Sequence, residues 1–179
     1  MDNGASSYRR FLDGDESAFD AIMQELFHSL VFFINRYVQD FHAAEDLAMD
    51  AMSDLIVHPH RYNFKVTLKT YVFMLGRSRA LDYIKHKKII PFVELSQAES
   101  VPGEDMEDSL FGHQQKQAVH AALKQLPENL REAVYLVYFA DMSYDEAAKI
   151  MKKTRKQVDN LLYRSKKALR VILGEGDTV

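Results

Sequence analysis

Basic and amide side chains recur at helical spacing close to the C-terminal end of the chain. Residues 149–170 hold nine Lys and Arg and a single acidic residue, Asp159. Arg, Lys, Asn and Gln are the side chains that bind DNA phosphates and the edges of bases in the major groove. Val158, Leu161 and Leu162 recur at three- and four-residue spacing, which predicts a helix whose opposite face packs on a core. We therefore expect DNA to be bound here by Thr154, Arg155, Lys156, Gln157, Asn160, Tyr163, Arg164 and Lys167.

Two helix-start signals flank a short turn in this part of the chain. A Ser-x-x-Glu motif begins at Ser143 and a Thr-x-x-Gln motif begins at Thr154, which is the spacing of a capping box. We expect a helix after each cap, the first ending at residue 151 and the second at residue 173. Ala147 or Ala148 supplies the small side chain that a close crossing of two such helices needs. The pair predicts a helix-turn-helix.

Charge is segregated along the rest of the chain. Residues 61–90 have eight Lys and Arg and one acidic residue, whereas residues 91–112 have six acidic residues and no base. Pro, Gly and Ser without periodicity also make residues 91–112 typical of a linker. We predict an all-α protein with two small helical domains, 1–90 and 113–179, which are joined by a flexible acidic linker at 91–112. Two basic stretches divided by an acidic one suggest two contacts with a polyanion.

Apolar periodicity places the other helices. In the N-terminal domain, one helix is predicted from Ser17 to residue 38. A second begins at residue 42 or 43, carries Glu45 and Asp46 in its first turn, and ends before Pro59. In the C-terminal domain, helices are expected at 113–126 and 129–139.

The last helix of the N-terminal domain follows a loop. Residues 58–66 show no helical pattern, and Thr67 is a suitable cap for a helix that runs to about residue 88. Within it, Val72, Leu75 and Leu81 are expected to pack in the core.

Several kinds of chemistry are excluded or unsupported. The chain has no cysteine, which rules out disulfides, thiolate nucleophiles and Cys-ligated metals. His58 and His60 flank Pro59, but a metal site needs more ligands, so we expect no metal and no cofactor. We find neither a Gly-rich phosphate loop nor a nucleophile motif, and expect no enzymatic activity. The longest apolar stretch, residues 26–38, is interrupted and short for a bilayer span. We also see no signal peptide, and so expect a cytoplasmic protein without membrane insertion.

The C-terminal domain resembles region four of bacterial RNA polymerase sigma factors. The resemblance lies in Leu-Pro-Glu at 126–128, Met-Ser-Tyr-Asp-Glu-Ala-Ala at 142–148 and Tyr-Arg-Ser-Lys-Lys-Ala-Leu at 163–169. It implies a domain that reads the minus-thirty-five promoter element. This chain has Lys152 where the family often has Gly, and Asp159 and Leu161 where basic residues are common, which affects the base sequence that is read.

The segment at 44–52 resembles the region-two helix with which sigma factors grip the polymerase clamp. Asp46 and Asp50 lie one helical turn apart with Met49 beside them, where the family usually has Gln. The resemblance implies polymerase binding through Asp46, Leu47, Met49 and Asp50.

The segment at 70–88 resembles the region-two helix that melts DNA, and the loop before it resembles the one that captures a flipped base of the minus-ten element. Aromatic and basic side chains suit this task because unpaired bases stack on rings while cations hold the phosphates. The implied residues are Arg61, Asn63, Phe64, Lys65, Lys69, Tyr71, Arg77, Ser78, Arg79 and Lys85.

Regions two and four with a short linker resemble the extracytoplasmic-function subgroup of sigma factors. The resemblance implies a non-catalytic subunit that binds the clamp and flap regions of core RNA polymerase, directs it to promoter DNA and helps to melt the duplex. It also implies an anti-sigma factor as a partner and an acidic linker that mimics nucleic acid. Two alternatives remain at this point: a stand-alone helix-turn-helix regulator, and a helical adaptor that does not touch DNA.

Overall fold

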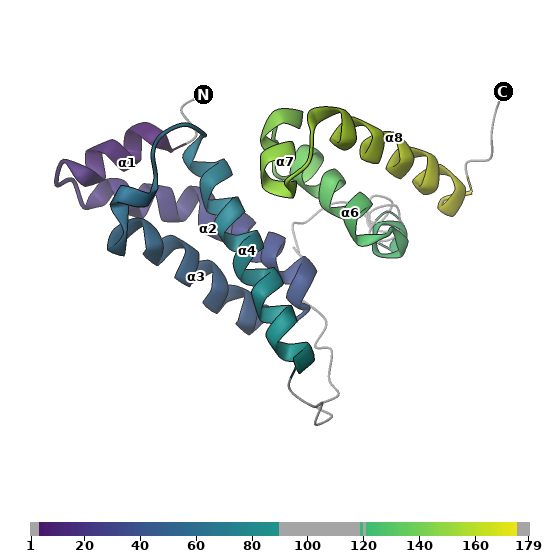
Figure 1. The fold of residues 1–179 in the computed structure, drawn as a ribbon, viewed down its shortest axis with the longest axis horizontal. Coiled ribbons are helices and arrows are strands. Elements are labelled where there is room, and N and C mark those ends of the chain that lie inside the picture. Colours follow the sequence, from purple (N-terminus) through teal and green to yellow (C-terminus); the bar gives the residue numbers. More distant parts are fainter. Residues whose placement is uncertain (1–3, 90–118, 120, 175–179) are drawn as a thin grey trace, which may run out of the picture. The chain divides into compact units, whose positions relative to one another are not determined.

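The computed structural model describes residues 4–89, 119 and 121–174. These residues form helices and no strand, so the all-α prediction is confirmed (Figure 1). The chain divides into two compact units, Met1–Val101 and Pro102–Val179. The predicted linker at 91–112 lies outside the described residues, and its boundaries stay a prediction.

The first unit is built around one long helix. α2 (Ser17–Val38) contacts α1 (Ala5–Leu12), α3 (Phe41–Val57) and α4 (Leu68–Ile89), and a short 3-10 turn, η1 (Pro59–Arg61), follows α3 (Figure 1). Apolar residues at helical spacing explain why α2 is central. Its fully buried side chains are Ile22, Leu26, Leu30, Phe33 and Ile34. α2 is long and apolar enough to cross a bilayer by length and composition, but here those side chains form the core of the unit.

Polar caps set the start of two helices in the first unit. The Asp40 carboxylate accepts a hydrogen bond from the backbone N–H of Ala43 (3.1 Å), so α3 begins at Phe41. The prediction that Glu45 and Asp46 lie in the first turn was therefore wrong, because the cap is earlier than the sequence pattern indicated. The predicted cap of α4 is confirmed: Thr67 Oγ1 accepts from the backbone N–H of Thr70 (3.2 Å).

Gly76 allows α4 to lie close to α2. A Cβ atom at this position would be 2.7 Å from Leu30 Cδ1 and 3.1 Å from Ile34 Cδ1, which is too close for an ordinary contact. Glycine costs up to about 1 kcal/mol in a helix interior relative to Ala. The close packing of the two helices offsets that cost and fixes the face of α4 that remains outside.

α1 is a helix that the sequence analysis did not predict. Its anchor is Tyr8, which is fully buried and whose hydroxyl donates to the carbonyl of Leu55 (2.7 Å). Burial, reinforced by Coulombic effects of Tyr71 and Tyr62, raises the pKa of Tyr8 to about 12. A buried phenol with a backbone acceptor stays neutral, and it fixes α1 against the C-terminal end of α3.

The second unit contains the helix-turn-helix. Residues 121–125 are helical, and the start predicted at 113 lies outside the described residues. Then follow α6 (Glu128–Val134), η2 (Tyr135–Phe139), α7 (Tyr144–Met151) and α8 (Arg155–Ile172) (Figure 1). The prediction of a single α-helix at 129–139 was wrong for its second half, because residues 135–139 form a π-helix. α8 packs on α6 and α7.

Both predicted capping boxes are present in the second unit. The Ser143 hydroxyl accepts from the N–H of Glu146 while the Glu146 carboxylate accepts from the N–H of Ser143, and Thr154 and Gln157 do the same for α8. Ala147 and Ala148 are both buried, as expected where helices cross. The turn between α7 and α8 is closed by Lys152 in the left-handed region (φ 54°), a conformation that glycine adopts at less cost.

Candidate nucleic-acid and polymerase interfaces

α8 separates an apolar face from a polar one. Val158, Leu161, Leu162 and Ser165 are buried, and Ser165 is tied down because its hydroxyl donates to the Leu130 carbonyl (3.2 Å). The opposite face is solvent-exposed along its whole length. It carries six of the predicted DNA-binding residues, Lys156, Gln157, Asn160, Tyr163, Arg164 and Lys167. The structure therefore brings these six together on one side of a rigid helix.

The other two predicted residues of this set have structural partners. Thr154 accepts the Gln157 N–H (3.2 Å), and Gln157 Oε1 accepts the Thr154 N–H (2.8 Å). Arg155 Nη1 donates to Asp145 Oδ2 (3.0 Å), which links the start of α8 to α7. Thr154 and Arg155 thus hold the helix-turn-helix in shape at the end of α8 that carries Gln157.

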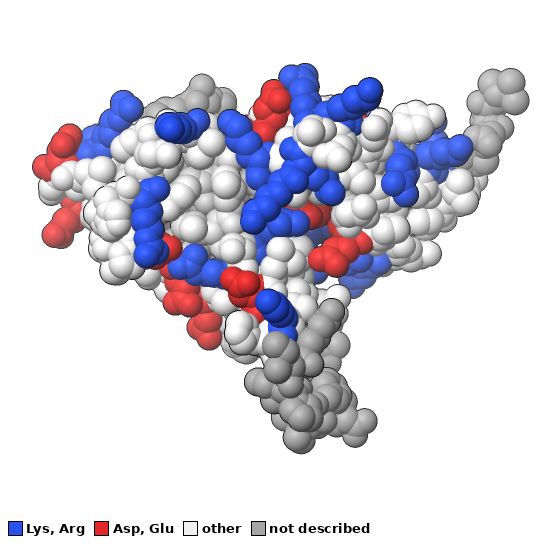
Figure 2. Space-filling model, in the orientation of Figure 1, with Lys and Arg blue, Asp and Glu red and all other residues white. Residues whose placement is uncertain are grey.

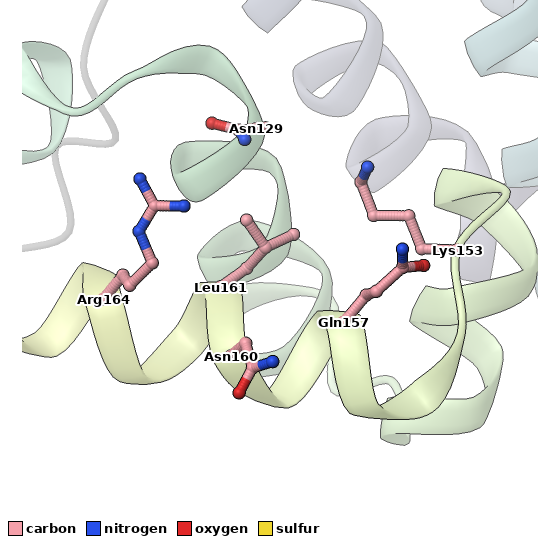
Figure 3. A pocket seen from close by; sticks show the side chains of 6 residues that line it. All are labelled: Asn129, Lys153, Gln157, Asn160, Leu161 and Arg164. Atoms are coloured by element: carbon pink, nitrogen blue, oxygen red, sulfur yellow. The ribbon is translucent and has the colours of Figure 1, made fainter.

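A shallow polar groove of about 260 Å³ lies beside the exposed face of α8. Figure 3 shows Gln157, Leu161 and Arg164 extending from α8 toward the side where Asn129 and Lys153 lie, while Asn160 points away from them. Asn129 and Lys153 were not among the predicted site residues. Lys153 lies in the basic stretch at 149–170 and could have been included, whereas Asn129 gave no signal because it comes from α6.

The loop that follows η1 is an ordered turn. Tyr62 is buried, its hydroxyl donates to the Val66 carbonyl (2.7 Å), and Asn63 Oδ1 accepts from the Lys65 N–H (3.1 Å). Phe64 has φ 59° and is 36% exposed. Asn63 and Lys65 are exposed on either side of it. The predicted loop residues are therefore held in one conformation with their side chains accessible.

Asp54 of α3 holds two of the predicted DNA-binding arginines. Its carboxylate is 3.0 Å from Arg79 Nη2 and 3.4 Å from Arg61 Nη1, and it also lies 3.9 Å from His58 Nε2. The Asp54 side chain is 13% exposed and that of Arg79 is 25% exposed. We call this group the Asp54 cluster. The structure thus gives Arg61 and Arg79 an internal partner that spacing in the sequence did not reveal.

The predicted residues on α4 do not share one face. Tyr71, Ser78 and Lys85 recur every seven residues and lie on the same side of the helix, with Tyr71 half-buried and the other two exposed. The pKa of Tyr71 is raised, first by burial and then by the Asp54 carboxylate. Lys69 and Arg77 lie on other sides and are half-buried.

Leu81 lies on the same side of α4 as Ser78 and Lys85. Its side chain is 38% exposed, whereas Val72 is fully buried and Leu75 is half-buried. The expectation that Leu81 packs in the core was therefore wrong, because the side of α4 that faces α2 and α3 does not include it. It adds an apolar side chain to the side of α4 that carries Tyr71, Ser78 and Lys85, which we call the outer face of α4.

The outer face of α3 carries acids and exposed apolar side chains. Asp46, Met49 and Asp50 are exposed and Leu47 is half-buried. Ile56 and Val57 continue the same side of the helix and are also exposed, although they were not among the predicted residues. In Figure 2 acidic side chains gather along the edge of the first unit where α3 runs, and Lys and Arg side chains lie along α8 of the second unit.

Among the residues that the structure describes, no group of three or more His, Asp or Glu could hold a metal ion.

Comparison with known proteins places both units in one family. Residues 22–89 match the family described as Sigma-70 region 2, and residues 116–169 match Sigma-70, region 4. Together the two matches cover more than half of the chain. The ECF RNA polymerase sigma factor SigM of Bacillus subtilis is 28% identical over 167 residues, covering 88% of this chain and 96% of SigM. The RNA polymerase sigma-H factor of Pseudomonas aeruginosa is 25% identical, covering 87% of this chain and 86% of that protein.

Solved structures show the same fold. The sigma factor RpoE of Bartonella quintana, in complex with the anti-sigma factor NepR, aligns with a TM-score of 0.69 at 19% identity and covers 89% of this chain and 98% of RpoE. CnrH in complex with the cytosolic domain of CnrY aligns with a TM-score of 0.65 at 15% identity, covering 98% and 97%. The alternatives of a stand-alone regulator and of an adaptor are set aside by matches to both sigma regions. The chain belongs to the sigma-70 family, is homologous to its extracytoplasmic-function members, and is an RNA polymerase sigma factor that directs transcription initiation at promoters.

Proposed function

We propose that three surfaces of this sigma factor divide the work of initiation. The exposed face of α8 reads the upstream promoter element, the loop at 61–65 with the outer face of α4 binds the minus-ten element, and the outer face of α3 binds the polymerase clamp. The protein acts in the cytoplasm and contributes no catalytic group of its own, since the polymerase makes the RNA. The observation that carries the proposal is the opposition of polar and buried faces on α8.

The α8 surface suits a major groove. A helix fits into this groove when one side is free of packing and carries donors for base edges and phosphates. Asn160 and Arg164, one turn apart, are candidates for base edges, while Lys156 and Lys167 at the ends of the face suit phosphates. The Arg155–Asp145 pair links the start of α8 to α7 at the end of this face.

The minus-ten surface suits unpaired DNA. Asn63 and Lys65 are exposed on an ordered loop, and Tyr71, Ser78 and Lys85 follow the outer face of α4. Single-stranded DNA is bound by such combinations of rings, amides and cations. We assign Arg61 and Arg79 a supporting role, in which the Asp54 cluster positions the loop against α4.

The α3 surface suits a basic partner with apolar contacts at its centre. Exposed apolar side chains flanked by acids are typical of protein interfaces. We infer that Met49 and Ile56 contribute apolar contacts and that Asp46 and Asp50 pair with cations of the polymerase. An anti-sigma factor would compete for such a surface, and the related RpoE was solved with an anti-sigma factor bound.

Run-off transcription with purified core polymerase tests the proposed function. The template is a library of promoter fragments, transcribed with and without this protein. We expect discrete transcripts only when the protein is present, and their start sites will define the two promoter elements. The library transcribed with another sigma factor serves as a control for polymerase activity. If the control gives transcripts and this protein gives none while it still binds core polymerase in a pull-down, the assignment of its DNA surfaces is contradicted for those promoters.

A further inference from the structure

α1 brings a cation to the loop that we assign to the minus-ten element. Tyr8 fixes α1 through its hydrogen bond to the carbonyl of Leu55 (2.7 Å), and its ring centroid is 5.6 Å from that of Tyr62. The next residue, Arg9, has its guanidinium carbon 4.9 Å from the centroid of the Phe64 ring. Two segments more than fifty residues apart in the sequence therefore meet at this point.

Arg9 differs from its neighbour Arg10. In the part of the chain that the structure describes, Arg9 is exposed and has no ion pair. Arg10 is exposed as well, but its guanidinium donates a hydrogen bond to the carboxylate of Asp15 (Nε to Oδ2, 3.0 Å). A guanidinium that lies on an aromatic ring keeps its N–H groups available at its edge. Arg9 is thus held in place and can still bind a second partner.

Phe64 is held in an uncommon backbone conformation. A φ of 59° is rare for a bulky residue and costs on the order of 1 kcal/mol or more. The ring is packed 4.6 Å from the Tyr62 ring and 6.2 Å from the Tyr8 ring, centroid to centroid. Such conformations persist only where their surroundings impose them, and ligand-binding loops are one such place. Because Arg9 covers one face of the ring, Phe64 supports a cation there and does not offer that face to a base.

We propose that Arg9 binds a phosphate of the unpaired non-template strand next to Asn63, and that Phe64 is the positioning residue for Arg9. The guanidinium edge presents parallel N–H donors that match two phosphate oxygens. This inference rests on the proposed minus-ten role of the loop. It adds α1 to the DNA-binding surface and gives Phe64 a role different from that of a bare stacking platform.

The test uses the holoenzyme and a fork-junction DNA. The fork is made from a promoter found by run-off transcription, with its minus-ten non-template strand unpaired. Affinity is measured between about 50 and about 200 mM salt, because loss of one phosphate contact to a single strand lowers the salt slope by about 0.7. Arg9→Ala should weaken binding by roughly three- to tenfold at the lower salt, and the deficit should shrink by about 2.5-fold at the higher salt. Arg10→Ala, the matched control, should remain within about twofold of the parent.

Phe64→Leu tests the positioning role. Leu keeps apolar packing against Tyr8 and Tyr62 but removes the ring on which Arg9 lies. If Arg9 acts through Phe64, the double variant with Arg9→Ala will bind no more weakly than Arg9→Ala alone. Effects that add in full would overturn the positioning role. Circular dichroism melts of each variant identify any that is unfolded.

Three outcomes separate this inference from the function on which it rests. If Asn63→Ala weakens fork binding while Arg9→Ala behaves like Arg10→Ala, the loop keeps its role and the Arg9 assignment is wrong. If Arg9→Ala weakens binding with an unchanged salt slope, the phosphate contact is wrong. If neither Asn63→Ala nor Arg9→Ala changes binding, the minus-ten role of the loop fails and the Arg9 assignment fails with it.

Discussion

The DNA-binding candidates of the two units are rich in the same cations but differ in how those cations are held. On α8 the polar face lies opposite the core, and one long-range pair, Arg155 with Asp145, is 68% and 60% exposed. In the first unit the corresponding pair, Arg79 with Asp54, is 25% and 13% exposed. The Arg9 guanidinium also lies over the Phe64 ring there. The side chains of the α8 surface are therefore positioned by the regular helix itself, whereas those of the first-unit surface are positioned by tertiary contacts. Substitutions of these contacts in the first unit should change its function by changing its structure. Substitutions on the exposed face of α8 should leave the structure of the second unit unchanged.

Gly76→Val should have the largest effect. The added side chain would meet Leu30 and Ile34 of α2, and overpacking of this kind costs about 2–3 kcal/mol. Hydrogen exchange of the full chain, read by mass spectrometry, should show lost protection in α2 and α4 and unchanged protection in α8. Ser78→Val places the same side chain at an exposed position of α4 and is the control. Equal protection in the two variants would mean that α4 and α2 have room to separate.

Tyr8→Phe should change the pH dependence of stability in the first unit only. The folded-state pKa of Tyr8 is raised to about 12, so the phenol binds its proton more tightly in the folded protein than in the unfolded chain. Its contribution is complete below about pH 10, the unfolded value, and is lost as pH rises from there through about 12. Over that window the parent should lose about 2–3 kcal/mol that the variant does not lose.

Urea unfolding of the parent and of Tyr8→Phe between pH 9 and about pH 11.5 measures most of this difference, about 2 kcal/mol. At neutral pH the variant should be less stable by about 1 kcal/mol, since the hydrogen bond to Leu55 is missing. Parallel pH profiles for the two proteins would show that Tyr8 ionises as readily when folded as when unfolded.

Asp54→Ala and Asp145→Ala compare the two ion-pair sites directly. Loss of Asp54 leaves Arg79 partly buried without its partner and should cost about 2 kcal/mol. Loss of Asp145 removes an exposed pair and should cost about 0.5 kcal/mol or less. Segment-resolved hydrogen exchange assigns each change to its unit. Similar small costs at both sites would remove the distinction between the two surfaces.

Asp46→Lys with Asp50→Lys should weaken core polymerase binding by about 1.5–2 kcal/mol, because two attractive charges become repulsive. The fold should be unaffected, since both side chains are exposed. Asp20→Lys with Glu25→Lys makes the same net charge change on the exposed side of α2 and serves as the control in a titration of labelled polymerase. If both double variants lose affinity equally, the effect is one of net charge and the α3 surface is not the contact.

Arg164→Ala should have the smallest effect, about 1 kcal/mol in affinity for the upstream element. Lys166→Ala, on a different side of α8, should change affinity less. Measuring holoenzyme binding to wild-type and substituted upstream elements distinguishes two roles. A loss confined to one sequence assigns Arg164 to base reading, and a uniform loss assigns it to a phosphate.

The contrast between a surface positioned by one helix and a surface positioned by tertiary contacts also explains which features could be predicted from the sequence. The caps at Ser143 and Thr154 and the buried face of α8 are local patterns, and the structure confirms them. The helix of residues 17–38 was also predicted, because its apolar pattern is long. The Asp54 cluster, in contrast, joins two residues shortly after Asp54, His58 and Arg61, to Arg79 in the middle of α4, and no local pattern indicates the contact with Arg79.

α1 is a second feature that local patterns in the sequence could not predict. A helix of eight residues, Ala5–Leu12, is short, and short helices are stabilised by packing more than by their own propensity. Its position depends on Tyr8 reaching the carbonyl of Leu55, which no spacing within α1 can indicate. For the same reason Arg9 was absent from the predicted site, while Arg61 and Arg79 were included because their segments resemble sigma region two.

The cap of α8 fixes the side chain of one of the proposed DNA-binding residues. Gln157 is the only amide on this face that also closes a capping box, and its carbonyl oxygen is already used by the Thr154 N–H (2.8 Å). A glutamine normally offers one donor group and one acceptor, and the pair is what recognises adenine. The carbonyl oxygen of Gln157 keeps a second lone pair, but the cap fixes its direction, so if α8 reads the upstream element as proposed, Gln157 can present its amide to a base only from that direction. The residue that caps α8 would therefore also limit the orientations in which the proposed DNA-binding face can meet a base pair.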